Sequence, residues 1–187
     1  GSGVILNGRL QRGRGMASEW GHTTISGSYD ENRKCSCGRF NCLEIFCGTE
    51  GLAQTYCNVF GVRREDLSSE FIQEISKKMR KRGDVYWDVL FETYCHDLTE
   101  GILNIVNVHQ PDCIVLGGGN ACDPMTEKVK KLLQDDTKEN KLEIMAHGVD
   151  IRVAANLQSG LIGAAKYAID SYDAEIAKNR IEYGVYS

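Results

Sequence analysis

The chain has 187 residues, of which 42% are hydrophobic and 26% are charged, as is typical of a globular domain with a buried core. Its formal net charge of -4 disfavours a nucleic-acid-binding surface, which is usually basic. It contains no secretory signal and no apolar run of the roughly 18 residues that a membrane span needs, so we expect no membrane association and a cytoplasmic location.

A β-hairpin is the first predicted element, over residues 4–10. Asn7 and Gly8 separate two short β-prone segments there, and an Asn-Gly pair strongly favours a two-residue hairpin turn. The three residues before the hairpin are either an expression scar or native sequence. Residues 13–29 are irregular and rich in Gly, Ser and Thr, which is typical of a binding loop, and we expect one short strand within them at residues 23–25.

Helices and strands follow one another over the rest of the chain. Apolar residues that recur every three or four positions predict helices at residues 43–59, 69–82, 85–108, 124–134 and 159–177. Ser68 or Ser69 is the expected N-cap of the second of these, and the last is expected to be amphipathic or buried. Unbroken apolar runs predict strands at residues 113–116 and 149–154. An apolar strand followed by a glycine turn and a helix indicates an α/β fold with a covered sheet.

Four potential metal ligands lie close together in the sequence, namely His22, Cys35, Cys37 and Cys42. One imidazole and three thiols form the ligand set of a closed, tetrahedral, structural zinc site. The alternative is a set of unrelated buried thiols, which the compact Cys-x-Cys-Gly-x-x-x-Cys spacing disfavours. We therefore predict one bound zinc ion in a zinc-binding segment over residues 22–42. The other cysteines are scattered through apolar segments, as is typical of buried free thiols in a reducing compartment.

Two glutamates, Glu19 and Glu44, flank this predicted metal site. A metal site that fixes its own backbone also fixes the carboxylates at its edges, and an ionised carboxylate accepts charge-assisted hydrogen bonds from hydroxyl groups. Each glutamate also has a simpler explanation. Glu19 could be a solvated loop acid, and Glu44 could be an acid that the helix dipole favours in a first helical turn.

The order and spacing of these residues match a known pattern. The chain reads Gly15-x-x-x-Glu19-x-Gly21-His22 and later Cys35-x-Cys37-Gly38-x-x-x-Cys42-Leu43-Glu44. This pattern closely resembles the signature of the ROK family of sugar kinases and sugar-responsive repressors. The resemblance covers nearly the whole of this chain but only the later part of a family member.

The resemblance implies a fold and a set of binding residues. The fold is an actin-like (ribonuclease H-like) ATPase lobe, with a mixed sheet, flanking helices and a zinc-binding loop. In the family, the residues that match Glu19, His22 and Glu44 bind the sugar, and the histidine also binds the zinc. The triplet Gly117–Gly119 matches a family segment near the adenosine of ATP, where glycine lets the backbone approach a ligand. A tight structural turn is the alternative for that triplet.

The resemblance also implies what lies outside the chain. ROK kinases take a first phosphate loop from an Asp-x-Gly-Gly-Thr motif and a catalytic base from an Asn-Asp pair, and neither motif occurs in this sequence. Residues 1–187 are therefore expected to be a C-terminal lobe whose N-terminal lobe is absent. ATP and Mg²⁺ would serve the complete protein, and this chain alone is expected to have no useful kinase activity.

The leading hypothesis is ATP-dependent phosphorylation of a hexose-type sugar by the complete protein. One alternative is the effector domain of a sugar-sensing ROK repressor, and another is a non-catalytic, zinc-stabilised interaction module. Both sugar-binding hypotheses use Glu19 and Glu44, so these residues do not separate them. The expected partners are a hexose, ATP and a second copy of the chain in a homo-oligomer, without nucleic acid.

Overall fold

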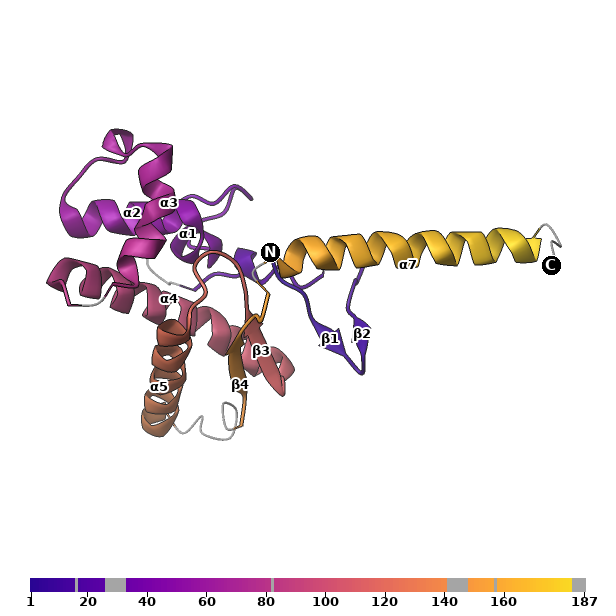
Figure 1. Ribbon diagram of the computed structural model, residues 1–187. Helices are drawn as coiled ribbons and strands as arrows, with labels where there is room; N and C mark the ends of the chain where they lie inside the picture. Colours follow the sequence, from indigo (N-terminus) through magenta and orange to yellow (C-terminus); the bar gives the residue numbers. More distant parts are fainter. Residues whose placement is uncertain (16, 26–32, 82, 141–147, 157, 183–187) are drawn as a thin grey trace.

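A computed structural model describes residues 1–15, 17–25, 33–81, 83–140, 148–156 and 158–182. Figure 1 shows a body of packed helices with a short pair of strands, β3 and β4, along one side. The N-terminal hairpin, formed by β1 and β2, and the long helix α7 extend from this body on the same side. The described chain thus combines one packed body with two projecting elements.

The N-terminal hairpin forms as the Asn-Gly signal predicts. Strand β1 (Ile5–Leu6) pairs antiparallel with β2 (Arg9–Leu10). Asn7 and Gly8 between them have φ angles of 52° and 73°, the two left-handed conformations that a tight hairpin turn of type I′ requires. Ile5 is 69% exposed and Leu10 is 52% exposed, so the hairpin leaves its apolar side chains uncovered.

Among the described residues, six α-helices and two short 3₁₀ helices follow one another along the chain, and Figure 1 shows how they are arranged. They are η1 (Trp20–His22), α1 (Glu44–Cys47), α2 (Thr49–Phe60), η2 (Arg64–Asp66), α3 (Ser69–Met79), α4 (Val85–His109), α5 (Asp123–Asn140) and α7 (Ser159–Glu182). Side-chain caps set two of the starts. The Ser68 hydroxyl accepts a hydrogen bond from the Phe71 amide, and the Asp84 carboxylate accepts from the amides of Tyr86 and Trp87.

The helix predicted over residues 43–59 is in fact two helices, α1 and α2, which meet at Gly48. Gly48 adopts an extended conformation, with ψ at 172°, and the chain folds back there. A Cβ atom built on Gly51 would lie 2.2 Å from the carbonyl oxygen of Ile45. The sharp break therefore depends on a residue without a side chain at position 51, which helical periodicity does not reveal.

Helix α4 is the centre of the hydrophobic core. Its buried residues pack with those of the neighbouring helices α2, α3 and α5, and strand β4 joins the same core by packing on α5. The largest fully buried side chains include Ile75 of α3, Leu90 and Ile102 of α4, Met125 of α5 and Ile151 of β4. The core thus holds together elements from residue 52 to residue 151.

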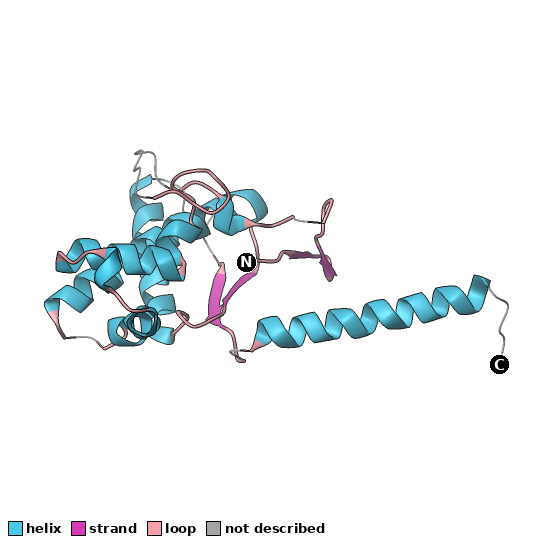
Figure 2. Cartoon of the chain, turned by 90° about the horizontal axis from the view of Figure 1, so that it is seen from above, coloured by secondary structure: helices cyan, strands magenta, loops and turns pink. Residues whose placement is uncertain are grey.

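The strands form two separate pairs rather than the single mixed sheet that was predicted (Figure 2). Strand β3 (Cys113–Leu116) runs parallel to β4 (Asp150–Val153), with Ile114 opposite Ile151. No described residue joins this pair to the N-terminal hairpin as part of one sheet. The prediction of an α/β fold is therefore confirmed, whereas the mixed sheet is not formed by the described residues.

Over residues 160–173, where its side chains are described, helix α7 is neither buried nor covered on one face, contrary to the prediction. Every side chain described between residues 160 and 173 is exposed, including the apolar Leu161 at 70% and Ile169 at 61%. The guanidinium of Arg12 lies 4.7 Å from the centre of the Tyr167 ring, which links α7 to the N-terminal segment. Among the described residues, no helix combines the length and the hydropathy that crossing a membrane requires.

Candidate metal centre and the adjoining carboxylate

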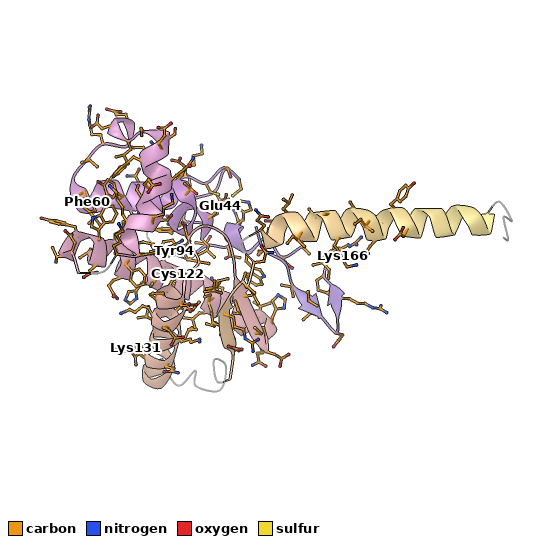
Figure 3. All side chains as sticks on the ribbon, viewed as in Figure 1. Glu44, Phe60, Tyr94, Cys122, Lys131 and Lys166 are labelled. Carbon is orange, nitrogen blue, oxygen red and sulfur yellow. The ribbon has the colours of Figure 1, made fainter. Side chains whose placement is uncertain are left out.

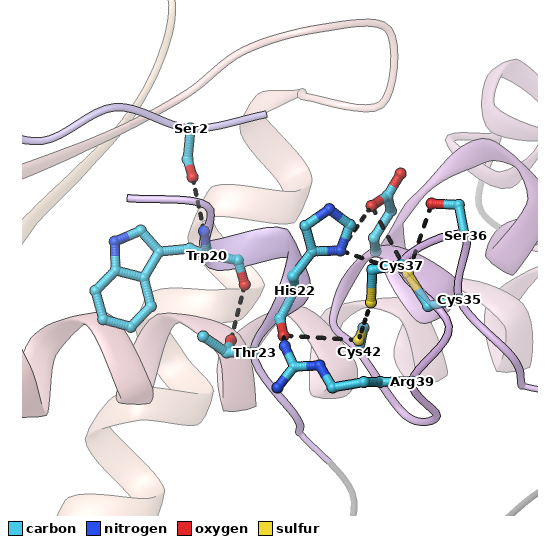
Figure 4. A network of polar contacts seen from close by, with 10 residues as sticks. Ser2, Trp20, His22, Thr23, Cys35, Ser36, Cys37, Arg39 and Cys42 are labelled. Carbon is cyan, nitrogen blue, oxygen red and sulfur yellow. Dashed lines mark hydrogen bonds and ion pairs between the residues drawn. The ribbon is translucent and has the colours of Figure 1, made fainter. Parts of the chain in front are cut away.

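Residues 34–40 of the predicted zinc-binding segment fold into a tight backbone turn (Figure 4), and residues 26–32 of that segment lie outside the described residues. Lys34 and Phe40 form an antiparallel bridge, and the Cys35 amide donates to the carbonyl oxygen of Arg39 at 2.8 Å. At the tip, Gly38 has φ at 87°, a left-handed conformation in which glycine carries no steric penalty. The turn therefore brings Cys35 and Cys37 to one side of the loop.

Two further backbone contacts bring His22 beside this turn. Thr24 forms a bridge with Cys42, and the Leu43 amide donates to the carbonyl oxygen of Thr23 at 2.8 Å. The strand expected at residues 23–25 is thus present only as this isolated bridge. Its effect is to hold the histidine and the third cysteine next to each other.

The four predicted ligands are brought together. The ligand atoms of His22, Cys35, Cys37 and Cys42 all lie within 4.8 Å of one another. Nδ1 of His22 is 3.5 Å from Sγ of Cys35, and the Sγ atoms of Cys37 and Cys42 are 3.7 Å apart. A tetrahedral zinc with Zn–S bonds of about 2.3 Å separates its ligand atoms by about 3.5 to 3.8 Å. These two pairs therefore fit a tetrahedral ion, and the cysteine pair is too far apart for a disulfide bond of about 2.05 Å.

The three thiols differ in their electrostatic surroundings. The backbone amide of Arg39 and then its guanidinium lower the pKa of Cys37 to about 6. Burial, and after it the neighbouring thiols, raise the pKa of Cys42 to about 12. In the absence of a cation, Cys37 therefore ionises before Cys42, and its thiolate disfavours a second thiolate beside it. A bound divalent cation offsets the repulsion between neighbouring thiolates, because its charge stabilises all of them together.

Glu44 joins this cluster from the start of helix α1. Its Oε2 atom lies 3.3 Å from Nδ1 of His22 and 4.0 Å from Sγ of Cys35. A Cβ atom built on Gly21 would lie 3.6 Å from the Cβ of Glu44, so the small residue before His22 allows this close packing. The Glu44 side chain is 51% exposed, and it lies on the side of the helical body from which α7 projects (Figure 3).

A cavity of about 420 Å³ opens beside Glu44. It is lined by the zinc-binding turn and by the break between α1 and α2, through Lys34, Cys35, Ser36, Glu44, Ile45, Gly48, Thr49 and Glu50. The Glu44 carboxylate therefore reaches both the metal cluster and a space large enough for a small polar ligand.

Glu19, the other predicted carboxylate, is not brought into the cluster. It is exposed and lies immediately before η1, where its carbonyl oxygen accepts from the His22 amide at 3.0 Å. Among the described residues, no hydrogen bond or ion pair joins its side chain to the metal ligands or to Glu44. Its proposed role in binding sugar remains a prediction.

Residues of helix α4 contact the segments that carry the candidate metal centre. Asn104 donates to the carbonyl oxygen of Thr24 at 3.5 Å, and the Tyr94 hydroxyl donates to that of Cys47 at 3.3 Å. The Trp20 ring meets the ring of His109 edge to face, with their centres 5.3 Å apart. Contacts along the length of α4 therefore fix both sides of the candidate metal centre.

Sequence reasoning missed Arg33. Its side chain is only 6% exposed, and it donates hydrogen bonds to the backbone of Ile45 and Gly51 and to the hydroxyl of Thr55. It lies in a loop segment without hydrophobic periodicity, so no pattern in the sequence indicated that it would be buried. Only the path of the zinc-binding segment across α2 reveals its position.

The glycine triplet forms an exposed turn after β3. Gly118 has φ at 93°, and a Cβ atom on Gly118 or Gly119 would meet nothing within 4 Å. The Arg80 guanidinium donates to the carbonyl oxygen of Gly119, and Asn120 donates to that of Cys47 at 3.4 Å. The turn is thus held by its neighbours yet open on its outer side.

Comparison with known proteins identifies the family. The model of the ROK family matches residues 1–171 of the chain. The chain belongs to the ROK family. Its glycine turn, its Cys and His cluster and Glu44 all lie within the matched residues.

Three ROK relatives illustrate the range of the match. The chain is 31% identical over 124 residues to the xylose repressor of Caldicellulosiruptor bescii, and the aligned region covers 63% of this chain and 30% of that protein. It is 25% identical over 181 residues to the glucokinase of Halalkalibacterium halodurans, and the aligned region covers 87% of this chain and 51% of that protein. Its fold is similar to that of the ROK hexokinase from Thermus thermophilus, with a TM-score of 0.66 and 24% identity, covering 87% of this chain and 51% of that one. The chain thus spans about half the length of these kinases and less of the repressor.

Proposed function

We propose that this chain is the lobe of an ATP-dependent hexose kinase that binds the sugar and part of the nucleotide. The observation that carries the proposal is the position of Glu44, whose exposed carboxylate lies 3.3 Å from His22 at the edge of the metal cluster. Nδ1 is the ring atom that lies 3.3 Å from Glu44, and it also lies 3.5 Å from Sγ of Cys35, so it is the atom suited to a zinc ion with Glu44 beside it. This leaves Nε2 of the ring free to form a hydrogen bond with a ligand.

A zinc ion held by His22 and the three cysteines would fix the backbone that carries these groups. His22 and Glu44 would then offer an imidazole and a carboxylate to neighbouring hydroxyl groups of one sugar. Each bond to the carboxylate is charge-assisted, and an analogue that lacks the hydroxyl would leave the carboxylate unpaired and bind more weakly. Glu19, immediately before η1, is the third proposed sugar-binding residue.

The turn at Gly117–Gly119 is the proposed site for the adenosine of ATP. Its open outer side and the lack of a side chain at Gly118 and Gly119 support the close approach of a ligand to the backbone. In an actin-like kinase, ATP and Mg²⁺ lie between this lobe and a second one. Phosphoryl transfer also needs a base for the sugar hydroxyl, and the Asn-Asp pair that supplies it in ROK kinases does not occur in this sequence. We therefore propose that the chain alone does not phosphorylate sugars.

The second candidate function is the effector domain of a sugar-sensing repressor. Its support is the 31% identity to a xylose repressor, together with the fact that sugar binding by His22 and Glu44 serves a sensor equally well. A zinc-stabilised interaction module is a third possibility, and it predicts zinc binding without affinity for sugar. The exposed apolar residues of α7 suit a surface that a second lobe or a second copy covers.

One experiment separates these functions. Hexose binding is measured by titration of the purified chain, and ATP-dependent hexose phosphorylation is measured for the chain and for its longer parent protein. A kinase lobe binds hexose, is inactive alone and is active within the parent. A repressor domain binds sugar but phosphorylates nothing in either form. Phosphorylation by the 187-residue chain itself would contradict the proposal, and zinc without sugar binding would favour the interaction module.

A further inference from the structure

Arg33 lies almost entirely inside the protein, next to the candidate metal centre. Its side chain is 6% exposed, whereas arginine is normally left at the surface unless its charge is paired. It stands two residues before the ligand Cys35, at the point where the zinc-binding segment crosses helices α1 and α2. A buried arginine in this position needs a reason, because removing a guanidinium from water is costly.

The reason lies in the contacts that its guanidinium makes. One terminal nitrogen donates to the carbonyl oxygen of Ile45 at 3.0 Å and to that of Gly51 at 3.3 Å. The other donates to the hydroxyl of Thr55 at 3.1 Å. The ring of Phe46 covers the guanidinium at 4.7 Å. One planar group thereby joins both helices across the break at Gly48.

One of these bonds satisfies a group that the break leaves without a helical partner, the carbonyl oxygen of Ile45, whereas the Gly51 carbonyl also accepts from the Thr55 hydroxyl at 3.0 Å. Helix α1 has only four residues, so its carbonyl oxygens cannot all accept bonds within the helix. A buried carbonyl oxygen without a donor is unfavourable. Asp97 of helix α4 lies close enough for the charge of Arg33 to act on it. The buried cation thus has both acceptors for its hydrogen bonds and a neighbouring acid.

Glu44 is bonded in the chain directly to Ile45, one of these acceptors. On its other side, the Leu43 amide is held by the carbonyl oxygen of Thr23. The start of the short helix that carries Glu44 is therefore held by the segments that also carry the candidate metal ligands. The Arg33 bonds join this helix to α2, and the bond from Tyr94 to Cys47 joins its other end to α4.

We propose that Arg33 is a positioning residue of the sugar site, which sets the direction of the Glu44 carboxylate by holding the junction between α1 and α2. This inference rests on the proposed function, in which Glu44 binds a hydroxyl group of the sugar. Arg33 itself, being buried beneath the loop, does not touch the sugar. Lysine cannot replace it, since one ammonium group cannot reach three acceptors that a planar fork spans.

The test compares Arg33→Lys with Arg64→Lys. Arg64 also binds a residue of α2, through a bidentate ion pair with Glu50 at 2.9 to 3.0 Å. Because Arg64 lies at the surface, Arg64→Lys is the matched control. Zinc content and cooperative unfolding are measured first, and glucose binding is then followed by amide chemical shifts. We expect Arg33→Lys to keep zinc and fold, and to weaken glucose binding about tenfold, the factor for one charge-assisted hydrogen bond. Arg64→Lys should bind glucose as the unchanged protein does.

A double-mutant cycle with Glu44→Gln shows whether Arg33 acts through Glu44. We expect Arg33→Lys to have no further effect on glucose binding once Glu44 is replaced. The proposal is overturned if the two replacements weaken glucose binding additively, or if Arg33→Lys leaves glucose binding unchanged. It is also overturned if Arg33→Lys loses zinc and its fold, because Arg33 would then have a structural role.

Hydrogen exchange distinguishes failure of the positioning role of Arg33 from failure of the proposed sugar-binding function. If the unchanged protein binds no hexose, the proposed function fails, and the positioning role is judged by the amides of residues 45–51. Faster exchange there in Arg33→Lys, with α3 unchanged, supports the positioning of the junction. Unchanged exchange at those amides overturns it.

Discussion

Gly101 of helix α4 lies directly against the side chain of Leu43. A Cβ atom on Gly101 would stand 2.5 Å from Cδ2 of Leu43, closer than atoms of two side chains can approach. Leu43 separates the candidate ligand Cys42 from Glu44, so this contact positions the candidate metal cluster and the carboxylate against the central helix. The candidate site thus depends on a glycine that carries no functional group.

The replacement Gly101→Ala should therefore destabilise the fold. The added methyl group forces Leu43 out of its place, and overpacking of this kind costs about 1–3 kcal/mol. Urea denaturation followed by circular dichroism measures the change. Gly163→Ala is the control, because a Cβ atom there meets nothing within 4 Å, and it should have no cost or stabilise α7 by up to about 1 kcal/mol. Equal effects of the two changes would show that the Leu43 contact is unimportant.

Zinc should be present in the purified protein at about one ion per chain. Cys37→Ser and Cys113→Ser form a matched pair, because both cysteines are exposed and only Cys37 belongs to the cluster. We expect Cys37→Ser to lose most of its zinc and to unfold at a lower temperature. Cys113→Ser should keep the zinc content and the unfolding temperature of the unchanged protein. Metal analysis and thermal unfolding give the answer. Full zinc retention in Cys37→Ser would exclude it as a ligand.

Asp97 should make stability depend on pH. Burial raises the pKa of Asp97 to about 6, although the charge of Arg33 opposes this. Because the pKa of an unfolded Asp is about 3.9, the folded state holds the proton more tightly. The stabilising contribution is therefore complete at pH values below the unfolded pKa and is lost as pH rises through about 6.

Replacement of this acid isolates its contribution. Between pH 5 and pH 8, the free energy of unfolding of the unchanged protein should fall relative to that of Asp97→Asn, by about 1 kcal/mol after allowance for partial exposure. The comparison cancels any effect of zinc loss that both proteins share. Parallel pH profiles for Asp97→Asn and the unchanged protein would contradict the assignment.

Gly119→Ala tests whether the glycine turn binds a nucleotide. The backbone of Gly119 does not need a left-handed conformation, and a Cβ atom there meets nothing within 4 Å, so the change should leave stability within about 0.5 kcal/mol. If adenosine packs against this backbone, ATP should bind about tenfold more weakly, because the methyl group obstructs it. Binding is measured with a fluorescent ATP analogue, for the chain and for its parent protein. Unchanged affinity in a parent that binds ATP would favour a purely structural turn.

Much of the local structure could be predicted because it depends on neighbouring residues. The Asn7-Gly8 turn, the Ser68 cap and the long apolar pattern of α4 each specify their own element, and the structure confirms them. The four candidate metal ligands were found for a similar reason, since their chemistry and spacing are visible without the fold. The structure then adds their distances to one another.

The rest depends on contacts between segments far apart in the sequence. The break at Gly48 requires the packing of Gly51 against Ile45, and helical periodicity runs through it without interruption. The burial of Arg33 follows from where the zinc-binding segment crosses α2, and a loop sequence carries no signal for that. Helix α7 contains many apolar residues, which favoured burial, but no described element covers them.

The compact spacing of the metal ligands also bears on how the protein is made. All four lie between residues 22 and 42, so they leave the ribosome before α4 has been synthesised. Closing so short a loop costs little conformational entropy compared with pairing distant segments. A zinc ion at the proposed site could therefore bind while the chain is still being translated, and α4 would then pack, through Gly101, against a loop that has already formed.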